Sequence, residues 1–167
     1  MADTDHNENY IDIMIESLRK KEEVLKAIIA RCDDQAEVIG NNEYGDINWN
    51  QFNGLIGDKE ILIDRLNELD DGFEALYKRI GEGLKADKDK YPEKVKEIQE
   101  YIRRVTDLGV TIRAKEERNR ANLERVLRPV KKEIRTSKRS MSVINSYNNV
   151  ISGGGLNTSS GWMDKKK

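Results

Sequence analysis

The chain has 167 residues, of which 37% are charged and 37% apolar, while only 6% are aromatic. This length suggests one domain, or one domain with a tail. So many charges and so few aromatic residues are typical of long helices and argue against most β-sandwiches. No apolar run approaches the roughly 18 residues of a membrane span, and residues 1–9 are polar and acidic, unlike a signal peptide. The composition therefore predicts an all-α protein without membrane insertion.

Charge is unevenly distributed along the chain. From Arg113 to the last residue there are 14 Lys/Arg and 5 Asp/Glu, which is a net charge of +9. Since the whole chain carries −1, the first 112 residues carry −10. A chain divided in this way can reach an acidic partner with its basic end while the remainder stays in solution.

The first predicted helix begins near Glu8 and ends at Ile39, and residues 1–9 are expected to be disordered. Apolar side chains recur along it in an a/d pattern over more than four heptads, which indicates a helix that packs against other helices. The members of this seam are Ile11, Met14, Leu18, Leu25, Ile28, Cys32 and Ile39, with Lys21 and Gln35 as polar interruptions.

The second predicted helix follows a break at residues 40–48. Asn48 and Gln51 have the spacing of a capping box, and Ile47 and Phe52 have that of a hydrophobic staple. At 1.5 Å per residue, a helix of about 37 residues is a rod of roughly 55 Å. Its apolar stripe consists of Phe52, Leu55, Leu62, Leu66, Leu69, Phe73, Leu76, Ile80 and Leu84.

Pro92 is well placed as the first residue of a third helix. The stripe of this helix is thin over residues 115–122 and is expected to extend beyond the first two helices. Pro129 should kink or end it. The stripe before Pro129 consists of Val95, Ile98, Ile102, Val105, Ile112, Leu123 and Val126, and Val130, Ile134, Met141, Ile144 and Tyr147 continue at roughly helical spacing after it.

Three long stripes joined by short loops predict an all-α fold, an elongated antiparallel bundle or hairpin of three long helices with a kinked or flexible C-terminal helical tail. The expected parts are a disordered N-terminus (1–9), a three-helix bundle (10–128), a helical segment (129–151) and a flexible, Gly- and Ser-rich tail (152–167).

Residues suited to catalysis are few and scattered. The single histidine, His6, lies in the segment expected to be disordered, and the single cysteine, Cys32, lies on the seam, where it is interpreted as a packing residue. One cysteine forms no internal disulfide, which fits a reducing cytoplasm. The adjacent carboxylates Asp70-Asp71 and Glu116-Glu117 are interpreted as solvated surface. No catalytic, cofactor-binding or metal-binding residue is predicted, so the chain is not expected to be an enzyme.

Binding is the more informative possibility. Residues 113–139 contain 11 basic and 4 acidic side chains. A nucleic-acid site would use these charges against phosphate, but no aromatic platform accompanies them. A membrane-surface helix would need a stronger apolar face. A helix that docks on a partner helix remains open, as does an ordinary solvated helix.

Several segments resemble one known family. Residues 59–74 (KEILIDRLNELDDGFE) resemble the second helix of FlgN-type flagellar export chaperones of Gram-positive bacteria. Residues 102–108 (IRRVTDL) and 116–119 (EERN) are similar to the third helix of that family. The tail is similar too, with KEIR at residues 132–135, a basic and Ser-rich stretch, a Tyr, a polar spacer and a closing DKKK.

The resemblance implies a cytoplasmic, non-enzymatic chaperone. Such proteins bind the helical C-termini of hook–filament junction proteins, the hook-associated proteins, before type III export, and deliver them to the export apparatus. The family's C-terminal helical region carries much of this contact, and here Pro129 interrupts it. Carried onto this sequence, the client-binding residues are Val126, Val130, Ile134, Met141, Ile144 and Tyr147.

Two other classes remain open at this point. A structural or adaptor coiled coil would use the narrow seams to self-associate, for example as a homodimer. A nucleic-acid-binding helical protein is the third and more distant alternative.

Overall fold

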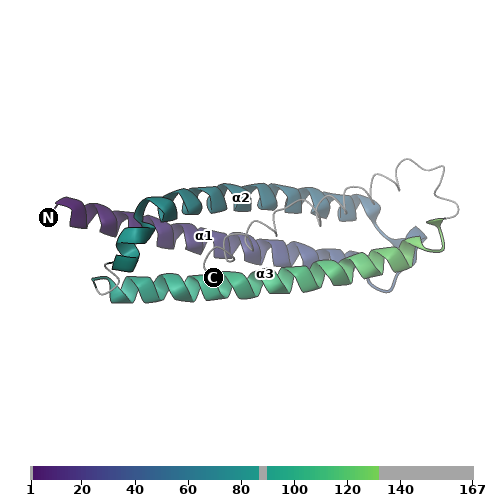
Figure 1. Ribbon diagram of the computed structural model, residues 1–167. Coiled ribbons are helices and arrows are strands. Elements are labelled where there is room, and N and C mark those ends of the chain that lie inside the picture. Colours follow the sequence, from purple (N-terminus) through teal and green to yellow (C-terminus); the bar gives the residue numbers. More distant parts are fainter. Residues whose placement is uncertain (1, 87–89, 132–167) are drawn as a thin grey trace.

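The computed structural model describes residues 2–86 and 90–131, with side chains for residues 8–81 and 90–131. Over these residues the elements are α1 (Ala2–Ile39), the short 3₁₀ helix η1 (Tyr44–Asp46), α2 (Trp49–Ala86) and α3 (Pro92–Leu127), with no strand (Figure 1). The predicted all-α fold with three long helices is confirmed.

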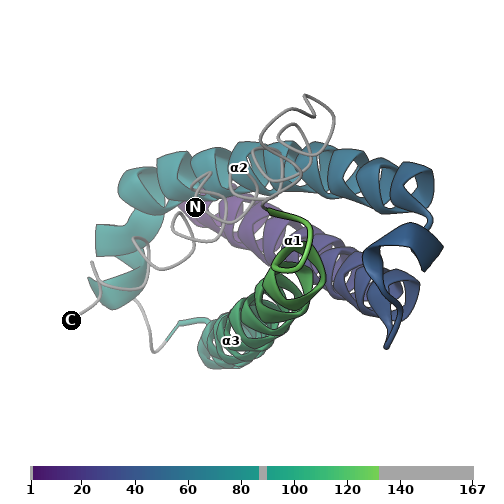
Figure 2. The same cartoon turned by 90° about the vertical axis from the view of Figure 1, so that its right-hand side faces the viewer.

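Successive helices run in opposite directions and together form an elongated rod (Figure 1). α1 packs against both α2 and α3, whereas α2 and α3 are not packed on each other in this way. Figure 2 shows α2 and α3 diverging on different sides of α1. α1 is therefore the central helix, and the side of the rod between α2 and α3 is not closed by helix packing.

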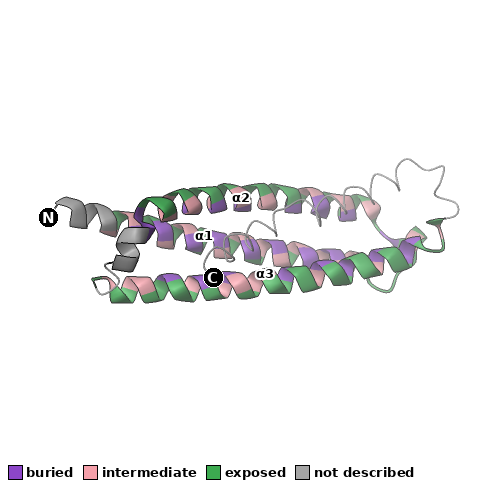
Figure 3. Cartoon of the chain, viewed as in Figure 1, coloured by how far each residue is buried: buried purple, intermediate pink, exposed green. Residues whose placement is uncertain are grey.

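The seam predicted for the first helix is the buried face of α1. Each of its nine members, polar ones included, is at most 7% exposed: Ile11, Met14, Leu18, Lys21, Leu25, Ile28, Cys32, Gln35 and Ile39. Figure 3 shows buried positions as stripes along the helices. The heptad pattern therefore identified the core of the central helix, and its two polar interruptions are core positions as well.

A separate apolar cluster closes one end of the rod, where α1 ends, α2 begins and α3 ends. We call it the end cluster, and it consists of Ile39, Ile47, Phe52, Ile56, Leu123, Val126 and Leu127. Because it draws on all three helices and on the loop, it holds the end of α3 onto the junction of the other two.

The α1–α2 junction has the local signals that the sequence predicted. Gly40 adopts a positive φ of 46° and ends α1, a conformation that glycine takes without steric cost. Asn48 Oδ1 accepts a hydrogen bond from the backbone N–H of Gln51 at 3.1 Å, so Asn48 caps α2. Ile47 and Phe52 lie together in the end cluster, as the predicted staple requires.

The N-terminal boundary differs from the expectation. Residues 1–9 were expected to be disordered, yet α1 begins at the second residue of the chain. Ile11 is buried, and Lys94 of α3 pairs with Glu8 at 3.0 Å and with Asp12 at 2.8 Å. Once a turn is held in this way, extending the helix costs far less than starting one. The anchored turn therefore explains the helix before it.

The C-terminal end of α3 also differs. The third stripe was expected to extend beyond its partners, but its last residues are buried in the end cluster, because the α1–α2 junction folds over them. α3 ends at Leu127, and Arg128 N still donates to Glu124 O at 2.9 Å. Pro129 has no N–H to donate next. α3 therefore ends just before Pro129, and a turn over residues 128–130 separates it from Lys131, which is again helical.

Candidate functional site

The structure places only two of the six predicted client-binding residues. Val126 is 3% exposed and belongs to the end cluster. Val130 is half-buried and packs against the same cluster. Ile134, Met141, Ile144 and Tyr147 lie outside the described residues. Val126 is thus a core residue in this structure, and Val130 lies at the border of the same cluster.

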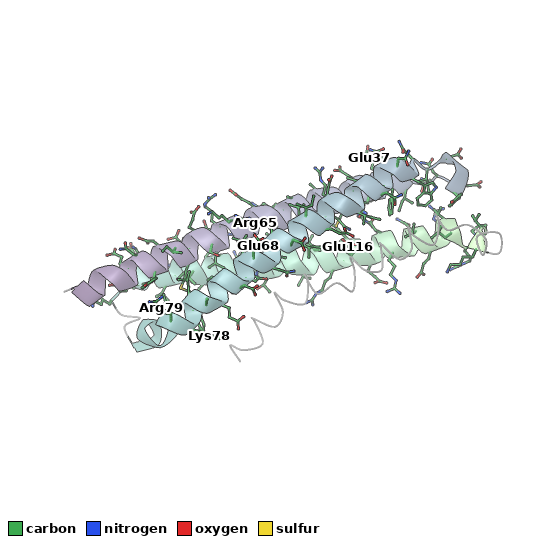
Figure 4. The ribbon with its side chains drawn as sticks, turned by 90° about the horizontal axis from the view of Figure 1, so that it is seen from above. Glu37, Arg65, Glu68, Lys78, Arg79 and Glu116 are labelled. Atoms are coloured by element: carbon green, nitrogen blue, oxygen red, sulfur yellow. The ribbon has the colours of Figure 1, made fainter. Side chains whose placement is uncertain are left out.

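A polar layer crosses the core and joins all three helices. Lys59 of α2 is 0% exposed, and its Nζ donates to a carboxylate oxygen of Glu116 on α3 and to Gln35 Oε1 of α1 at 2.7 Å. Cys32 Sγ donates to Glu116 Oε1 at 3.2 Å, and Asn119 Nδ2 donates to the backbone oxygen of Cys32 at 2.9 Å. In Figure 4, Glu116 lies where α2 passes over α3. The layer consists of Cys32, Gln35, Lys59, Glu116 and Asn119.

The polar layer pairs one buried cation with one buried carboxylate. Burying either charge alone would cost several kcal/mol, whereas a hydrogen-bonded pair offsets much of that cost. Each partner comes from a different helix and has a defined geometry, so a sliding helix would leave a charge unpaired. We therefore interpret the layer as a feature that fixes the register of the three helices.

A second buried ion pair links α1 to α2. Lys21 Nζ lies 2.5 Å from Asp70 Oδ1, and both side chains are 8% exposed. Burial raises the pKa of Asp70, although the charge of Lys21 and its hydrogen bond act in the opposite direction. Desolvation therefore outweighs the attraction to Lys21, and this pair belongs to the structural core.

The adjacent carboxylates are not both on a solvated surface. In Asp70-Asp71 and in Glu116-Glu117 the first residue is buried and the second exposed. Successive residues of a helix point about 100° apart, so only one member of each pair can face the core. The interpretation of all four as solvated surface was wrong for Asp70 and Glu116.

The cysteine is a packing residue, as the sequence indicated. Cys32 is 0% exposed, and burial raises the pKa of its thiol to about 12, although the charge of the nearby Lys59 acts in the other direction. At neutral pH the thiol is protonated and shielded from solvent, so it is a poor nucleophile. Within the described residues, no group of three or more His, Cys, Asp and Glu side chains is arranged to hold a metal ion.

The two sides of α2 differ in what they face. Asp58 lies 3.9 Å from Arg31 of α1, and the guanidinium of Arg79 lies over the ring of Tyr10 of α1 at 5.3 Å. Asp58 and Arg79 share one flank of the helix, which therefore faces α1. In Figure 4, Arg65, which belongs to the same flank, lies toward α1. Glu60, Asn67 and Glu74 form the opposite flank.

The two sides of α3 differ in the same way. Lys94 and Lys115 lie on one flank and pair with acidic residues of α1, Lys115 with Asp33 at 2.6 Å. The opposite flank is turned away from α1, toward α2. We call the surface between the flanks of α2 and α3 that are turned away from α1 the open side. It is bordered by Glu60, Asn67 and Glu74 of α2 and by Gln99, Thr106 and Arg113 of α3.

The outer part of α2 beside the open side is acidic. Glu60, Asp64, Asp71 and Glu74 follow one another along it at helical spacing, and we call them the acidic edge. Glu60, Asp64 and Asp71 are exposed and make no ion pair with another described side chain. This edge is a row of negative charge along one border of the open side.

Basic residues of α3 are largely engaged within the chain. Arg118 approaches Asp33 at 3.5 Å, Arg120 approaches Glu124 at 3.5 Å, and Arg125 Nη2 donates to Gly40 O at 3.2 Å. A nucleic-acid site would need such groups directed together at phosphate. Their internal partners disfavour that alternative for the described part of α3.

Exposed large apolar side chains are scattered over the described surface. Ile13, Ile61 and Val110 are 51–70% exposed, and they lie one on each long helix. Single exposed apolar residues are normal and do not define a binding patch. Among the described helices, none is long and apolar enough to span a bilayer.

The comparison with protein families gives one match. A family model described as FlgN protein matches residues 2–150, which is most of the chain. No curated protein and no solved structure matches. The matched region includes all three long helices and the predicted client-binding segment beyond them. The chain therefore belongs to the FlgN family, a family of flagellar export chaperones.

Proposed function

We propose that this chain is a cytoplasmic chaperone that binds the C-terminal helices of hook-associated proteins before they enter the flagellar type III export apparatus. The observation that carries the proposal is the extent of the family match, which continues to residue 150 and so includes the stripe after Pro129. Family membership supports a role in flagellar export; the class of client is the finer step proposed here.

The physical argument concerns the stripe itself. The last apolar residues of α3, Leu123, Val126 and Leu127, belong to the end cluster, and Val130 packs against it. Ile134, Met141, Ile144 and Tyr147 continue the pattern at helical spacing. An amphipathic segment of this kind can lay its apolar side against a partner helix. Contact through a single helix face is also limited in extent, which suits a chaperone that must release its client.

Titration calorimetry of the full chain against a C-terminal fragment of a hook-associated protein from the same bacterium tests this proposal. Ile134→Asp combined with Ile144→Asp should weaken binding by at least about tenfold, because charges would be placed on the docking side. Ile61→Asp is the matched control, since Ile61 is 70% exposed on α2, on the side away from the core. It should leave the affinity unchanged.

Two outcomes would contradict the proposal. If the unaltered chain gives no heat of binding with any hook-associated fragment, the client class is wrong. If the double Asp variant binds as tightly as the unaltered chain, the stripe is not the binding site. Neutralising Lys138 and Arg139 should matter less, and mainly at low salt, because exposed charges are screened.

A further inference from the structure

The open side is the one side of the rod that its own described helices do not close. α1 packs along both neighbours, but α2 and α3 do not pack along each other. Ile63 of α2 and Val95 of α3 are only half-buried beside it. Gly109 of α3 is also half-buried, and a Cβ there would meet no atom within 4 Å. Partly exposed apolar side chains therefore lie on both helices at this border, and α3 has room for one more small side chain at Gly109.

The last residues that the structure describes, which end at Lys131, lie at one end of the open side. Val130 packs against the end cluster, which also contains Ile56 from the first turns of α2. The segment that follows, residues 132–151, thus starts at one end of the open side. As a helix its 20 residues would span about 30 Å, compared with roughly 36 Å for α2 from Ile56 to Ile80.

Charge also matches. Residues 131–139 contain Lys131, Lys132, Arg135, Lys138 and Arg139 but only one acidic residue, Glu133. The acidic edge of α2 offers carboxylates along the same direction. The α3 border carries Arg113 and Arg120, so the basic residues of the segment would lie toward α2 rather than α3.

We propose that residues 132–151 fold back onto the open side in the free chain, with Ile134, Met141, Ile144 and Tyr147 inward and the basic residues toward the acidic edge of α2. The inference rests on the proposed function in one respect, since the same stripe is the proposed client-binding element. The tail and the client would then compete, and the free chaperone would cover its own binding stripe until a client displaces it.

Competition between the tail and the client would change the apparent affinity for the client by a measurable factor. The apparent affinity of a ligand falls by the fraction of molecules that are competent to bind it. If the tail is docked in about nine of ten free molecules, the apparent Kd is raised about tenfold. Locking the tail in place should therefore weaken client binding further, and releasing it should restore the original affinity.

Disulfide trapping in the full chain tests the docking. Counted from Val130 and Ile56, which share the end cluster, Ser142 and Asn67 both lie roughly 17–18 Å further along. In a Cys32→Ser background, Asn67→Cys with Ser142→Cys should form an intramolecular disulfide under mild oxidation. Arg65→Cys with Ser142→Cys is the matched control, because Arg65 lies on the flank of α2 that faces α1.

The trapping results separate the alternatives. Fast intramolecular cross-linking at position 67 and not at 65, suppressed by adding the client fragment first, supports the proposal. Equal or absent cross-linking at both positions overturns it, and cross-links between two chains assign the open side to a second copy instead. Circular dichroism of both reduced variants confirms that they fold alike.

Titration of the disulfide variant with the client fragment tests the competition separately from the cross-linking. In the reduced Asn67→Cys/Ser142→Cys variant the tail can undock, so whether the fragment binds at all tests the proposed function. The oxidised form should bind at least about tenfold more weakly. If the oxidised form binds as tightly as the reduced form, tail and client do not compete, and the proposal fails while the proposed function stands.

Discussion

Glu116→Ala removes the carboxylate that faces the Lys59 ammonium in the polar layer. Lys59 is 0% exposed and Glu116 4% exposed, so bulk solvent does not reach the pair. Removing one partner of a buried ion pair costs about 3–5 kcal/mol, because a buried charge is left uncompensated. Gln35 Oε1 stays 2.7 Å from Lys59 Nζ as a neutral acceptor, so we expect the lower part of that range, about 3 kcal/mol.

Replacing both partners should behave differently. In Lys59→Met combined with Glu116→Leu, two apolar side chains of similar volume occupy the layer and no charge is buried. Exchanges of this kind are often neutral or stabilising. The double variant should therefore recover most of the loss, and the two single changes should be strongly non-additive.

Urea unfolding of the full chain, followed by far-ultraviolet circular dichroism, measures these differences. Glu117→Ala is the control, since it removes a neighbouring carboxylate that is exposed, and it should change the stability by less than about 0.5 kcal/mol. A cost of Glu116→Ala as small as that of the control, or additive effects of the two single changes, would refute the buried ion pair as described.

Three further predictions concern the core, the cysteine and pH. Leu66→Ala should cost about 2–5 kcal/mol, because Leu66 is 0% exposed, whereas Ile61→Ala should cost little, and equal losses in urea unfolding would contradict this burial pattern. The Cys32 thiol should react with an aromatic disulfide reagent only as fast as the chain unfolds, and rapid labelling of the native chain would argue against its burial and its pKa of about 12. The hydrogen bond from Lys115 lowers the pKa of Asp33 below its usual 3.8, so the stability that this carboxylate contributes is present above that pH and is lost as the pH falls through its folded pKa. The stability difference between the unaltered chain and Asp33→Asn should accordingly shrink on acidification, and a difference that grows would reverse the sign of the argument.

Much of the fold could be predicted because apolar spacing reports burial directly. The seam from Ile11 to Ile39 is buried throughout, and Asn48, Pro92 and Pro129 mark helix boundaries through local backbone chemistry. Such signals depend on neighbours in sequence, so one chain is enough to read them.

The polar layer was missed because charged residues were assigned to the surface by type. Their positions held the missing signal. Lys59 lies seven residues from both Phe52 and Leu66, and Glu116 and Asn119 continue the heptad spacing between Ile112 and Leu123. The thin stretch at residues 115–122 was in fact a continuous core stripe with polar members. Spacing could have placed them, but their partners on other helices depend on the tertiary fold.

The fate of the third stripe could not be predicted from spacing alone. Val126 belongs to an apolar stripe, which indicates that this side of the helix packs against another element. The stripe looks the same whether that element belongs to the same chain or to another protein. The end cluster supplies an internal partner through Ile39, Ile47 and Phe52, which are distant in sequence. The candidate site accordingly moves from Val126 to the segment that follows Val130.

The mass of the complex in solution tests the central claim most directly. Light scattering coupled to size-exclusion chromatography would be applied to the 19.2 kDa chain, alone and with a C-terminal fragment of a hook-associated protein. The account predicts a new species containing one copy of the chain and one of the fragment. The chaperone proposal would be contradicted if the fragment eluted separately and the chain formed an assembly whose mass did not change when the fragment was added. That result would favour a self-associating coiled coil.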